Sequence, residues 1–507
     1  MKPLKSATIA APGFFGLNTQ ESGITLNSGF ALEATNCIID KFGRIGSRKG
    51  WTKINSTAFT GTPRAIAEYT KSDGSLEVLY TANNGLFRLE DDGTSTELTD
   101  ADATDITITD DDWQIIPYNN YAVFVQQGHQ MVYYDGSADT YNEYSSAPGS
   151  TTPSCGAACF NRVWVADDYV VYWSKILEPQ SFSGTGTGYL DIREIFGEDD
   201  TVTAITAYNN RLVIFGRRNI AFFAGAEDPT GTSFQMIDHI KGIGCIARDS
   251  VQNAGTDVVF LSADGVRTLG RTIQEVSSPI GDVSKNVRDE IVQFAAGESE
   301  FRIKGVFSQE NAFYLLTLPA TGYTYCFDMR VPLQDGSRRV TKWTTVPSAF
   351  WVRKNEDLLL GHEGYIARYN NYSDNGETYR IQYYTNYFDF GNATLESILK
   401  KIRLSLLGST QQDCSLKWAF DYDTDYRSTT FTLSEGITSE YNVDEYFSDD
   451  DTDNEAEYST GTVLDNISLN IGGRGAVVQI GLEADITADA LSLQKLDIFA
   501  KDGKMIS

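Results

Sequence analysis

The residues that could carry chemistry in this chain are few and widely separated. Only three histidines occur, His129, His239 and His362, and none has a serine or cysteine partner in a recognisable local motif. A nucleophile needs a base within hydrogen-bond reach, and a zinc site needs ligands at characteristic spacings. No histidine pair has such a spacing, so we expect each histidine to be a surface or turn residue.

The cysteine and aspartate runs are equally incomplete as sites. Cys155 and Cys159 are one residue further apart than a CxxC pair, and no second pair or nearby histidine completes a metal site. The runs at 421–425 and 449–453 resemble the start of a calcium loop, but each lacks the glycine at position six and the glutamate at position twelve. Neither a P-loop nor a GxGxxG motif is present. We therefore expect no catalytic residue, no cofactor and no defined metal site, and only weak surface binding of calcium stays open.

The composition favours many short strands joined by tight turns. The 507 residues include 44 glycines, 27 tyrosines and 27 phenylalanines, but only 12 prolines and 5 methionines. A hydrophobic content of 41% in a chain of this length can bury more than one core. No run approaches the roughly 18 apolar residues of a membrane span. The six scattered cysteines do not resemble a disulfide framework, so we expect free thiols and synthesis in the cytoplasm.

The chain is strongly acidic. It has 69 acidic and 41 basic residues, a formal net charge of −28. Tight binding to DNA relies on lysine and arginine replacing condensed counterions, so this chain should not wrap nucleic acid. The charge is compatible with a surface that DNA passes without sticking, although solubility alone would also explain it.

One pattern recurs seven times: a polar turn, a short β-branched and aromatic run, a second turn, and another such run. Equivalent points in the second runs are spaced by 38 to 59 residues: Leu86, Val132, Val170, Ile220, Val266, Tyr325 and Ile366. A period of roughly 40–50 residues built from hairpins is typical of β-propeller blades. In a β-sandwich or an unrelated chain of hairpins the spacing would be less even.

The fold class predicted is therefore all-β, with a propeller followed by a second β domain. We assign residues 1–45 to an N-terminal arm, 46–375 to the propeller and 376–507 to a C-terminal sandwich-like domain. Longer strands are predicted there at 400–407, 416–420, 467–471, 476–482 and 491–499. One short inserted helix is predicted over 284–296, with Ser284 as N-cap, Gly297 as stop, and Val287, Ile291 and Phe294 on one face.

Four segments in order resemble a known family. They are residues 16–24 with 33–37 and 43–51, residues 171–182, residues 212–223, and residues 242–246 with 258–269 and 278–281. Together they are similar to the packaged-DNA-stabilising hub, or tail nozzle, of short-tailed bacteriophages (podoviruses). The similarity runs from about residue 13 to 300 and continues more loosely through 383–407 and 491–500.

This resemblance implies a structural virion protein with no enzymatic activity. The family forms a hexameric ring below the portal and its adaptor, next to tail spikes or fibres and a tip or needle. Such a ring extends the channel through which duplex DNA passes, retains the packaged genome and guides its ejection. The resemblance implies six blades, whereas the seven hairpins leave seven open.

An acidic stretch at 444–457 has no apolar periodicity and should be a solvated loop. As a hypothesis, it faces the channel or the tail tip, through Asp444, Glu445, Asp449, Asp450, Asp451, Asp453, Glu455 and Glu457. Two other functions stay open. A receptor- or glycan-binding propeller would use aromatic side chains to stack on sugars. A propeller glycoside hydrolase would need a carboxylate pair, and nothing in the sequence singles one out.

Overall fold

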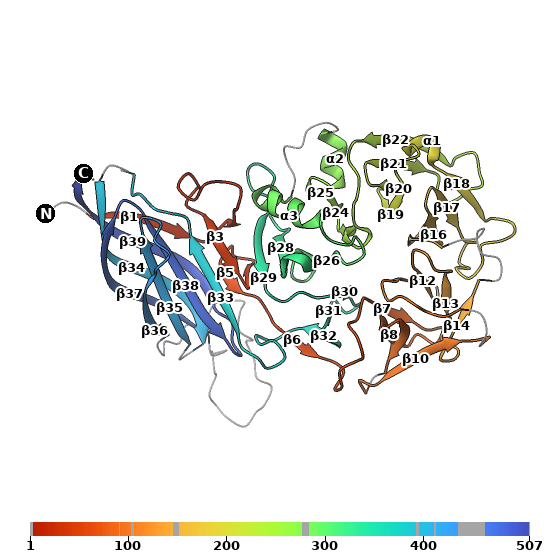
Figure 1. Cartoon of the computed structure of the whole chain (residues 1–507), viewed down its shortest axis with the longest axis horizontal. Coiled ribbons are helices and arrows are strands. Elements are labelled where there is room, and N and C mark those ends of the chain that lie inside the picture. The colour runs from red at the N-terminus through yellow and green to blue at the C-terminus, as the bar shows by residue number, and fades with distance from the viewer. Residues whose placement is uncertain are drawn as a thin grey trace, which may run out of the picture.

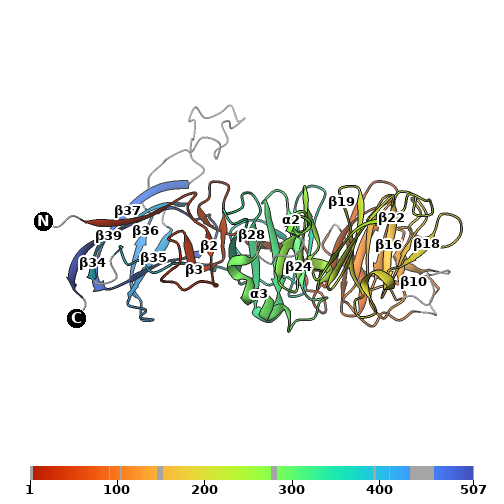
Figure 2. The same ribbon diagram turned by 90° about the horizontal axis from the view of Figure 1, so that it is seen from above.

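The computed structural model describes residues 4–90, 92–102, 106–144, 152–275, 283–391, 395–409, 412–433 and 462–505. Strands dominate them, and the all-β prediction is confirmed. The molecule is elongated, with a propeller at one end and a β-sandwich, which also holds both termini, at the other (Figures 1 and 2). Within the described residues, no helix is long and apolar enough to cross a membrane.

The first three blades each have four antiparallel strands in sequence order, and a short parallel pairing of the fourth strands joins blades one and two. Blade one contains β7 (Ala65–Thr70), β8 (Leu76–Ala82), β9 (Gly85–Leu89) and β10 (Ser95–Asp100). Blade two contains β11 (Gln114–Tyr118), β12 (Tyr121–Val125), β13 (Val132–Tyr134) and β14 (Thr140–Glu143). Blade three contains β15 (Cys155–Cys159), β16 (Arg162–Asp167), β17 (Val170–Trp173) and β18 (Gly188–Asp191), followed by the helix α1 (Arg193–Phe196).

Blades four to six continue the same order. Blade four contains β19 (Val202–Tyr208), β20 (Arg211–Gly216), β21 (Asn219–Ala224) and β22 (Gln235–Lys241). The 3-10 turn η1 (Arg248–Ser250) leads into blade five, whose described strands are β23 (Gln252–Ala254), β24 (Asp257–Ser262) and β25 (Gly265–Thr268). Blade six contains β26 (Lys304–Ser308), β27 (Phe313–Leu318), then the 3-10 turn η3 (Pro319–Thr321), β28 (Tyr323–Asp328) and β29 (Arg339–Trp343).

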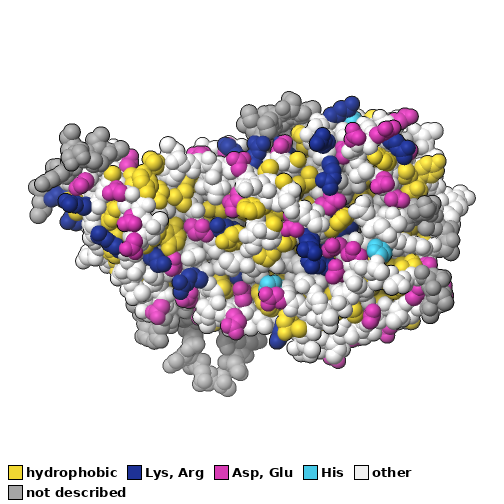
Figure 3. All heavy atoms as spheres, in the orientation of Figure 1, with side chains coloured by type: hydrophobic (Ala, Val, Ile, Leu, Met, Phe, Trp, Pro, Cys, Tyr) yellow, Lys and Arg dark blue, Asp and Glu magenta, His cyan; other side chains and the backbone are white. Residues whose placement is uncertain are grey.

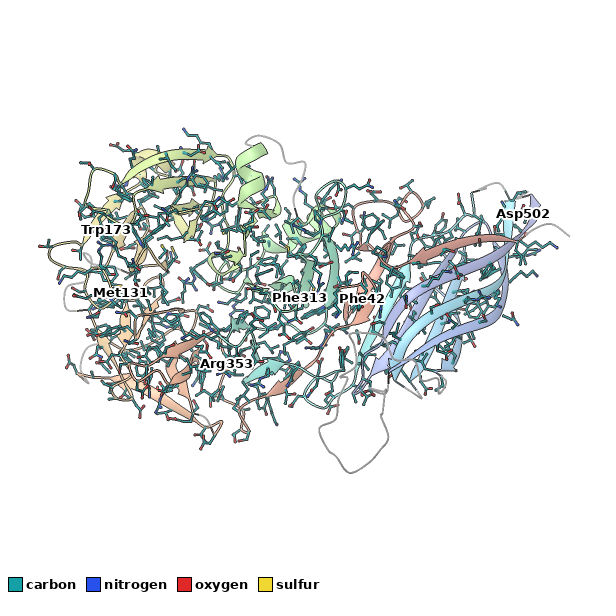
Figure 4. The ribbon with its side chains drawn as sticks, turned by 180° about the vertical axis from the view of Figure 1, so that it is seen from behind. Phe42, Met131, Trp173, Phe313, Arg353 and Asp502 are labelled. Atoms are coloured by element: carbon teal, nitrogen blue, oxygen red, sulfur yellow. The ribbon has the colours of Figure 1, made fainter. Side chains whose placement is uncertain are left out.

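Blade seven closes the ring by borrowing a strand from the other end of the propeller sequence. Its first three strands are β30 (Ala349–Val352), β31 (Leu358–His362) and β32 (Tyr365–Tyr369), and its fourth is β6 (Trp51–Lys53), which pairs with β32. Arg353, labelled in Figure 4, donates to Glu68 of blade one at 2.7 Å. The innermost elements β7, β11, β15, β19, η1, β26 and β30 contact one another in that cyclic order. The circle is therefore complete.

The hairpin pattern located every blade. All seven equivalent points from Leu86 to Ile366 lie in the third strand of their blade, and the strands from β6 to β32 form a single propeller with its blades in sequence order. Six blades, the number implied by the family resemblance, is wrong, because the innermost elements of seven blades contact one another around the ring. The seven hairpins of the sequence had left this number open.

Two helices lie near blades five and six. The predicted helix is present as the 3-10 turn η2 (Lys285–Val287) and α3 (Arg288–Ala295), with Val287 and Ile291 buried. Ser284 is not its side-chain cap. The Ser284 hydroxyl instead accepts the backbone N–H of Val266, which ties the helix entry to β25. The helix α2 (Leu269–Glu275), which packs on β24, had not been predicted.

The second domain is a β-sandwich whose facing side chains share one buried cluster with part of the propeller. One sheet contains β1 (Lys5–Ala10), β4 (Cys37–Ile39), β5 (Ile45–Ser47), β34 (Leu395–Ser409), β37 (Thr462–Gly475) and β39 (Ser492–Met505). The other contains β3 (Phe30–Thr35), β33 (Tyr379–Thr385), β35 (Asp413–Phe420), β36 (Arg427–Thr432) and β38 (Val478–Ile486). Strands at all five predicted positions are present.

The N-terminal residues do not form a separate arm as predicted. β1 pairs with β39, β4 and β5 join the same sheet, and β3 pairs with β33 of the other sheet. The two-residue strand β2 (Gly16–Leu17) lies between β3 and β29 of blade six, so one sheet runs from the propeller into the sandwich. Residues near the N-terminus therefore complete both domains.

Substituting the blade core tests this architecture. Phe215 and Phe260 are fully buried between blades four and five, with ring centroids 5.1 Å apart. Removing a buried Phe side chain costs about 3–5 kcal/mol, and an unpaired buried charge adds more. We expect Phe215→Asp or Phe260→Asp to abolish soluble expression. The matched control is Phe42→Asp, because the Phe42 side chain is 43% exposed. Normal melting of both core variants would contradict the assignment.

Candidate functional site

The most distinctive pocket of the propeller lies on its axis. Several innermost strands begin around it, which brings their first residues together. Its volume is about 300 Å³, and its walls include Arg64 before β7, Gln114 of β11, Gln252 of β23, Lys304 of β26 and Trp351 of β30. The propeller fold thus brings residues that are far apart in sequence together in one polar site.

A buried triad of charges holds this pocket together. Asp249 of η1 accepts from Arg248 Nε at 2.9 Å and from Lys304 Nζ at 2.6 Å. Burial by itself would raise the pKa of Asp249, but the two cations outweigh it and hold this pKa well below its ordinary value. The carboxylate is therefore charged at neutral pH, and its charge is neutralised locally.

Arg248 also crosses the axis to other blades. Its guanidinium donates to the carbonyl of Ser154 at 2.8 Å and to that of Asp112 at 3.3 Å, and it lies over the Phe301 ring. Blades two, three, five and six are thereby joined through one side chain. The major groove of duplex DNA is by itself about 12 Å wide, so a duplex cannot pass through a pocket of about 300 Å³ that Arg248 spans. Any DNA path must lie outside the propeller axis.

Three consecutive carboxylates lie beside the pocket. Asp110, Asp111 and Asp112 each place one oxygen within 4.8 Å of the others, a spacing that a cation could bridge. One of these carboxylates already has a structural role, because Asp110 Oδ1 accepts hydrogen bonds from the backbone N–H groups of Asp111 and Asp112 at 2.6 and 2.9 Å. Asp111 lies 3.9 Å from Arg64. Proximity alone therefore assigns no ion to them.

The three histidines pack on aromatic rings rather than lying free on the surface. The ring pairs are His129 with Trp113, His239 with Phe196, and His362 with Trp51. His239 also shares a 2.9 Å hydrogen bond with Asn219, and burial lowers its pKa. These contacts give each ring a structural role that the sequence did not reveal.

The cysteine pair and the first aspartate run are structural as well. Both cysteines lie in β15, where burial raises the pKa of Cys155 and of Cys159 to about 12. A thiol with that pKa is protonated at neutral pH and is a poor nucleophile. Asp421, in the run at 421–425, accepts the backbone N–H groups of Ala476 and Val477 at 2.6 and 3.2 Å.

The acidic loop singled out from the sequence lies outside the described residues. This applies to Asp444, Glu445, Asp449, Asp450, Asp451, Asp453, Glu455 and Glu457. The hypothesis that it faces a channel stays a prediction.

A second buried site joins the two domains. Arg48, which is 1% exposed, follows β5 and donates to both carboxylate oxygens of Asp374 at 2.8 and 2.6 Å. It also donates to Asn36 at 3.1 Å and to Thr345 at 2.9 Å, and it lies over the Tyr379 ring. Asp374 and Thr345 adjoin the propeller, whereas Asn36 and Tyr379 belong to the sandwich side.

The neighbours of Arg48 complete this joint. Asn36, at a left-handed φ of 54°, donates to the carbonyl of Arg380 and accepts from the backbone N–H of Thr344. Gly16 lies against β29, where an added Cβ would come within 2.3 Å of the Val340 oxygen. The family-like segments 16–24, 33–37 and 43–51 thus all supply residues to the domain joint. Sequence reasoning found these segments but missed that Arg48 is buried.

Removing the axial carboxylate should destabilise the propeller. Asp249→Asn leaves Arg248 and Lys304 buried without their counter-charge, a loss of about 3–5 kcal/mol. We expect a clearly lower melting temperature by calorimetry. Asp264→Asn is the matched control in the same blade, because its carboxylate is half exposed and pairs with Arg267 only at 3.5 Å. Equal melting of the two variants would show that the triad contributes little.

The same carboxylate predicts a pH dependence. Because the folded-state pKa of Asp249 is lowered, its stabilisation is complete above the unfolded pKa of about 3.9 and is lost as pH falls toward the folded value. Asparagine does not titrate. The stability difference between wild type and Asp249→Asn should therefore be constant above about pH 5 and narrow below about pH 4. Denaturant titrations across this range measure it.

Removing the Arg48 guanidinium should weaken the attachment between the propeller and the sandwich. Arg48→Met leaves Asp374 without its bidentate partner, so we expect a loss of about 3–5 kcal/mol and faster hydrogen exchange in β29 and β33. The control is Arg368→Met, whose exposed guanidinium pairs with Asp357 at 3.1 Å and should cost under about 1 kcal/mol. Unchanged exchange at both strands in Arg48→Met would exclude a locking role.

The sequence matches no family model and no curated protein. Among solved structures, similarity extends to the extracellular domain of the one-component system BT4673 from B. thetaiotaomicron (11% identity, TM-score 0.40, 64% of this chain). That match spans 40% of the other chain. Virginiamycin B lyase from Staphylococcus aureus (10%, 0.39, 63% of this chain and 97% of that chain) and BamB from Moraxella catarrhalis (10%, 0.38, 72% and 99%) are also similar. Similarities this distant say nothing about function, and the strand pairing itself defines the propeller.

Proposed function

We propose that this chain is a structural protein of a short-tailed phage virion, the hub or nozzle subunit of a homo-hexameric tail ring. In this role it extends the DNA channel below the portal and adaptor, next to the spikes or fibres and the tip. It retains the genome and guides its ejection without catalysing a reaction. The observation that carries the proposal is the joint at Arg48, because the family-like segments supply it and it makes the two domains one rigid building block.

The distribution of charge supports this role. Residues 65–200, which span blades one to three, contain 24 acidic and 5 basic residues. Residues 434–461 contain 10 acidic residues and no basic one. The rest of the chain is therefore nearly neutral. Two concentrated acidic regions suit a ring that must repel the phosphates of DNA. At physiological ionic strength this repulsion acts over a Debye length of roughly 8 Å.

The narrow axis of the propeller also fits a ring. Since Arg248 closes the axis of one copy, the channel would be formed between several copies, and each propeller would serve as a solid wall. Rings of identical subunits enclose such a space on their symmetry axis.

A glycan-binding module is the second candidate, and one pocket favours it. Phe59, Tyr80 and Phe87 form a stack with centroid distances of 4.5 and 5.2 Å on blade one. They line a pocket of about 440 Å³ together with hydroxyl side chains and Glu97. Aromatic faces beside hydroxyl groups suit sugars. Binding on a glycan array that is lost in Phe59→Ala would favour this function over the ring.

The proposed ring predicts two measurements on purified protein. Negative-stain microscopy should show a sixfold ring, and duplex DNA should not bind measurably at about 0.15 M salt, where basic channel or clamp proteins do bind. Particles that stay monomeric at high protein concentration, or tight DNA binding at this salt, would contradict the proposal.

A further inference from the structure

The outer face of the six-stranded sandwich sheet is defined by its register. Residues directly opposite each other on paired strands share one face. Lys401 of β34 lies opposite Phe499 of β39, and Arg403 lies opposite Asp497. The alternate residues Ile402 and Leu404 are buried in the core, so the lysine and arginine row points outward.

This outer face is basic. Its charged side chains are Lys401, Arg403, Arg474, Lys495 and Lys501 against Asp497 and Glu396. Asp497 is 4% exposed and is bound by Thr8 and Lys495. Within the described ranges, Lys401, Arg403 and Lys501 form no ion pair with a carboxylate. Figure 3 shows Lys and Arg side chains at this end of the molecule, interspersed with Asp and Glu. With five cations against two carboxylates, this face has a net positive charge on a chain of net charge −28.

The complementary surface lies on blade three. Asp191 ends β18, and Glu194, Glu198 and Asp199 lie in and just after α1. All four are exposed, and none forms an ion pair within the part of the chain that the structure describes. Tyr189 of β18 projects beside them and is 68% exposed. Acidic side chains around an exposed aromatic ring suit a protein interface.

The two surfaces lie at opposite ends of the molecule. Figure 4 labels Asp502 of β39 at the sandwich end and Trp173 of blade three at the far propeller end. The basic face and the acidic patch of one rigid chain therefore cannot contact each other. Each basic face can instead contact the acidic patch of another copy. Repeating such a contact between unlike faces generates a closed ring when the rotation allows it.

We propose that a second copy of this chain docks its basic sandwich face onto the acidic blade-three patch, head to tail. The inference rests on the proposed ring and names the two faces that build it. Unpaired opposite charges across such a contact speed association and fix its register, and salt weakens them. The exposed Tyr189 ring would supply apolar contact at its centre.

Charge swaps test this interface. One variant carries Lys401→Glu, Arg474→Glu and Lys501→Glu, and a second carries Asp191→Lys, Glu194→Lys and Glu198→Lys. Lys495 is left in place because it pairs with the buried Asp497. Arg403 is left in place because it lies over the Phe499 ring. The control reverses three exposed cations elsewhere, Lys53→Glu, Arg302→Glu and Lys354→Glu. Light scattering after size exclusion measures the assembly mass, and melting curves check that each variant folds.

We expect each interface variant to raise the dissociation constant of the ring at least tenfold, while the control assembles like wild type. A mixture of the two variants should recover rings, because one copy then has two acidic ends and the other two basic ends, and a ring of six can alternate them. Wild-type rings should also dissociate between about 0.05 and 0.5 M salt.

The outcomes separate the two proposals. If both interface variants form rings with the dissociation constant of wild type, or if salt does not dissociate the rings, the assigned faces are wrong. The ring itself is not contradicted by this result. A wild-type protein that stays monomeric at low salt contradicts the ring and the interface together. If instead the variant with the reversed sandwich face keeps its ring but loses duplex DNA that wild type binds, the basic face belongs to DNA and the docking proposal is wrong.

Discussion

The buried guanidinium of Arg48 is the contact on which the shape of this molecule depends. It binds both oxygens of Asp374 and also reaches Asn36 and Thr345, so the propeller and the sandwich share one hydrogen-bonded centre. A buried arginine with a full set of acceptors is held in one geometry, because any other arrangement leaves a desolvated charge unpaired. The sheet that continues from β29 through β2 and β3 reinforces this joint with backbone hydrogen bonds. The two domains therefore act as a single elongated block.

The propeller is closed by interactions of two kinds. At its outer edge β6 completes blade seven, and between the innermost strands Glu68 binds Arg353, so the first and last blades are tied. On its axis, Arg248, Asp249 and Lys304 link blades that are not neighbours in sequence. Because this neutralised triad narrows the axis to a pocket of about 300 Å³, duplex DNA cannot pass through the propeller. The charges of the chain are unevenly distributed between the blades and the sandwich.

That uneven charge gives the molecule a polarity. Acidic residues concentrate in blades one to three, at one end, and an outward row of lysine and arginine covers the sandwich sheet at the other. Charges that find no partner within a rigid chain remain available for another molecule. The same asymmetry serves both proposals, since acidic walls repel DNA while complementary ends bring copies together.

The sequence alone determined the blades, because each hairpin carries its own local signal: polar turns, β-branched runs and a regular spacing. The seven equivalent points, the buried Phe215 and Phe260, the helix ending at Ala295 and the long C-terminal strands all follow from such local patterns. Only the tertiary structure decided where the chain ends go. Contacts between residues hundreds of positions apart, or in different blades, decide three features of the fold. They place Trp51–Lys53 in blade seven and β1 to β5 in the sandwich, and they bury Arg48 and Arg248. No periodicity marks such contacts, since an arginine that will be buried looks in sequence like one that will be solvated.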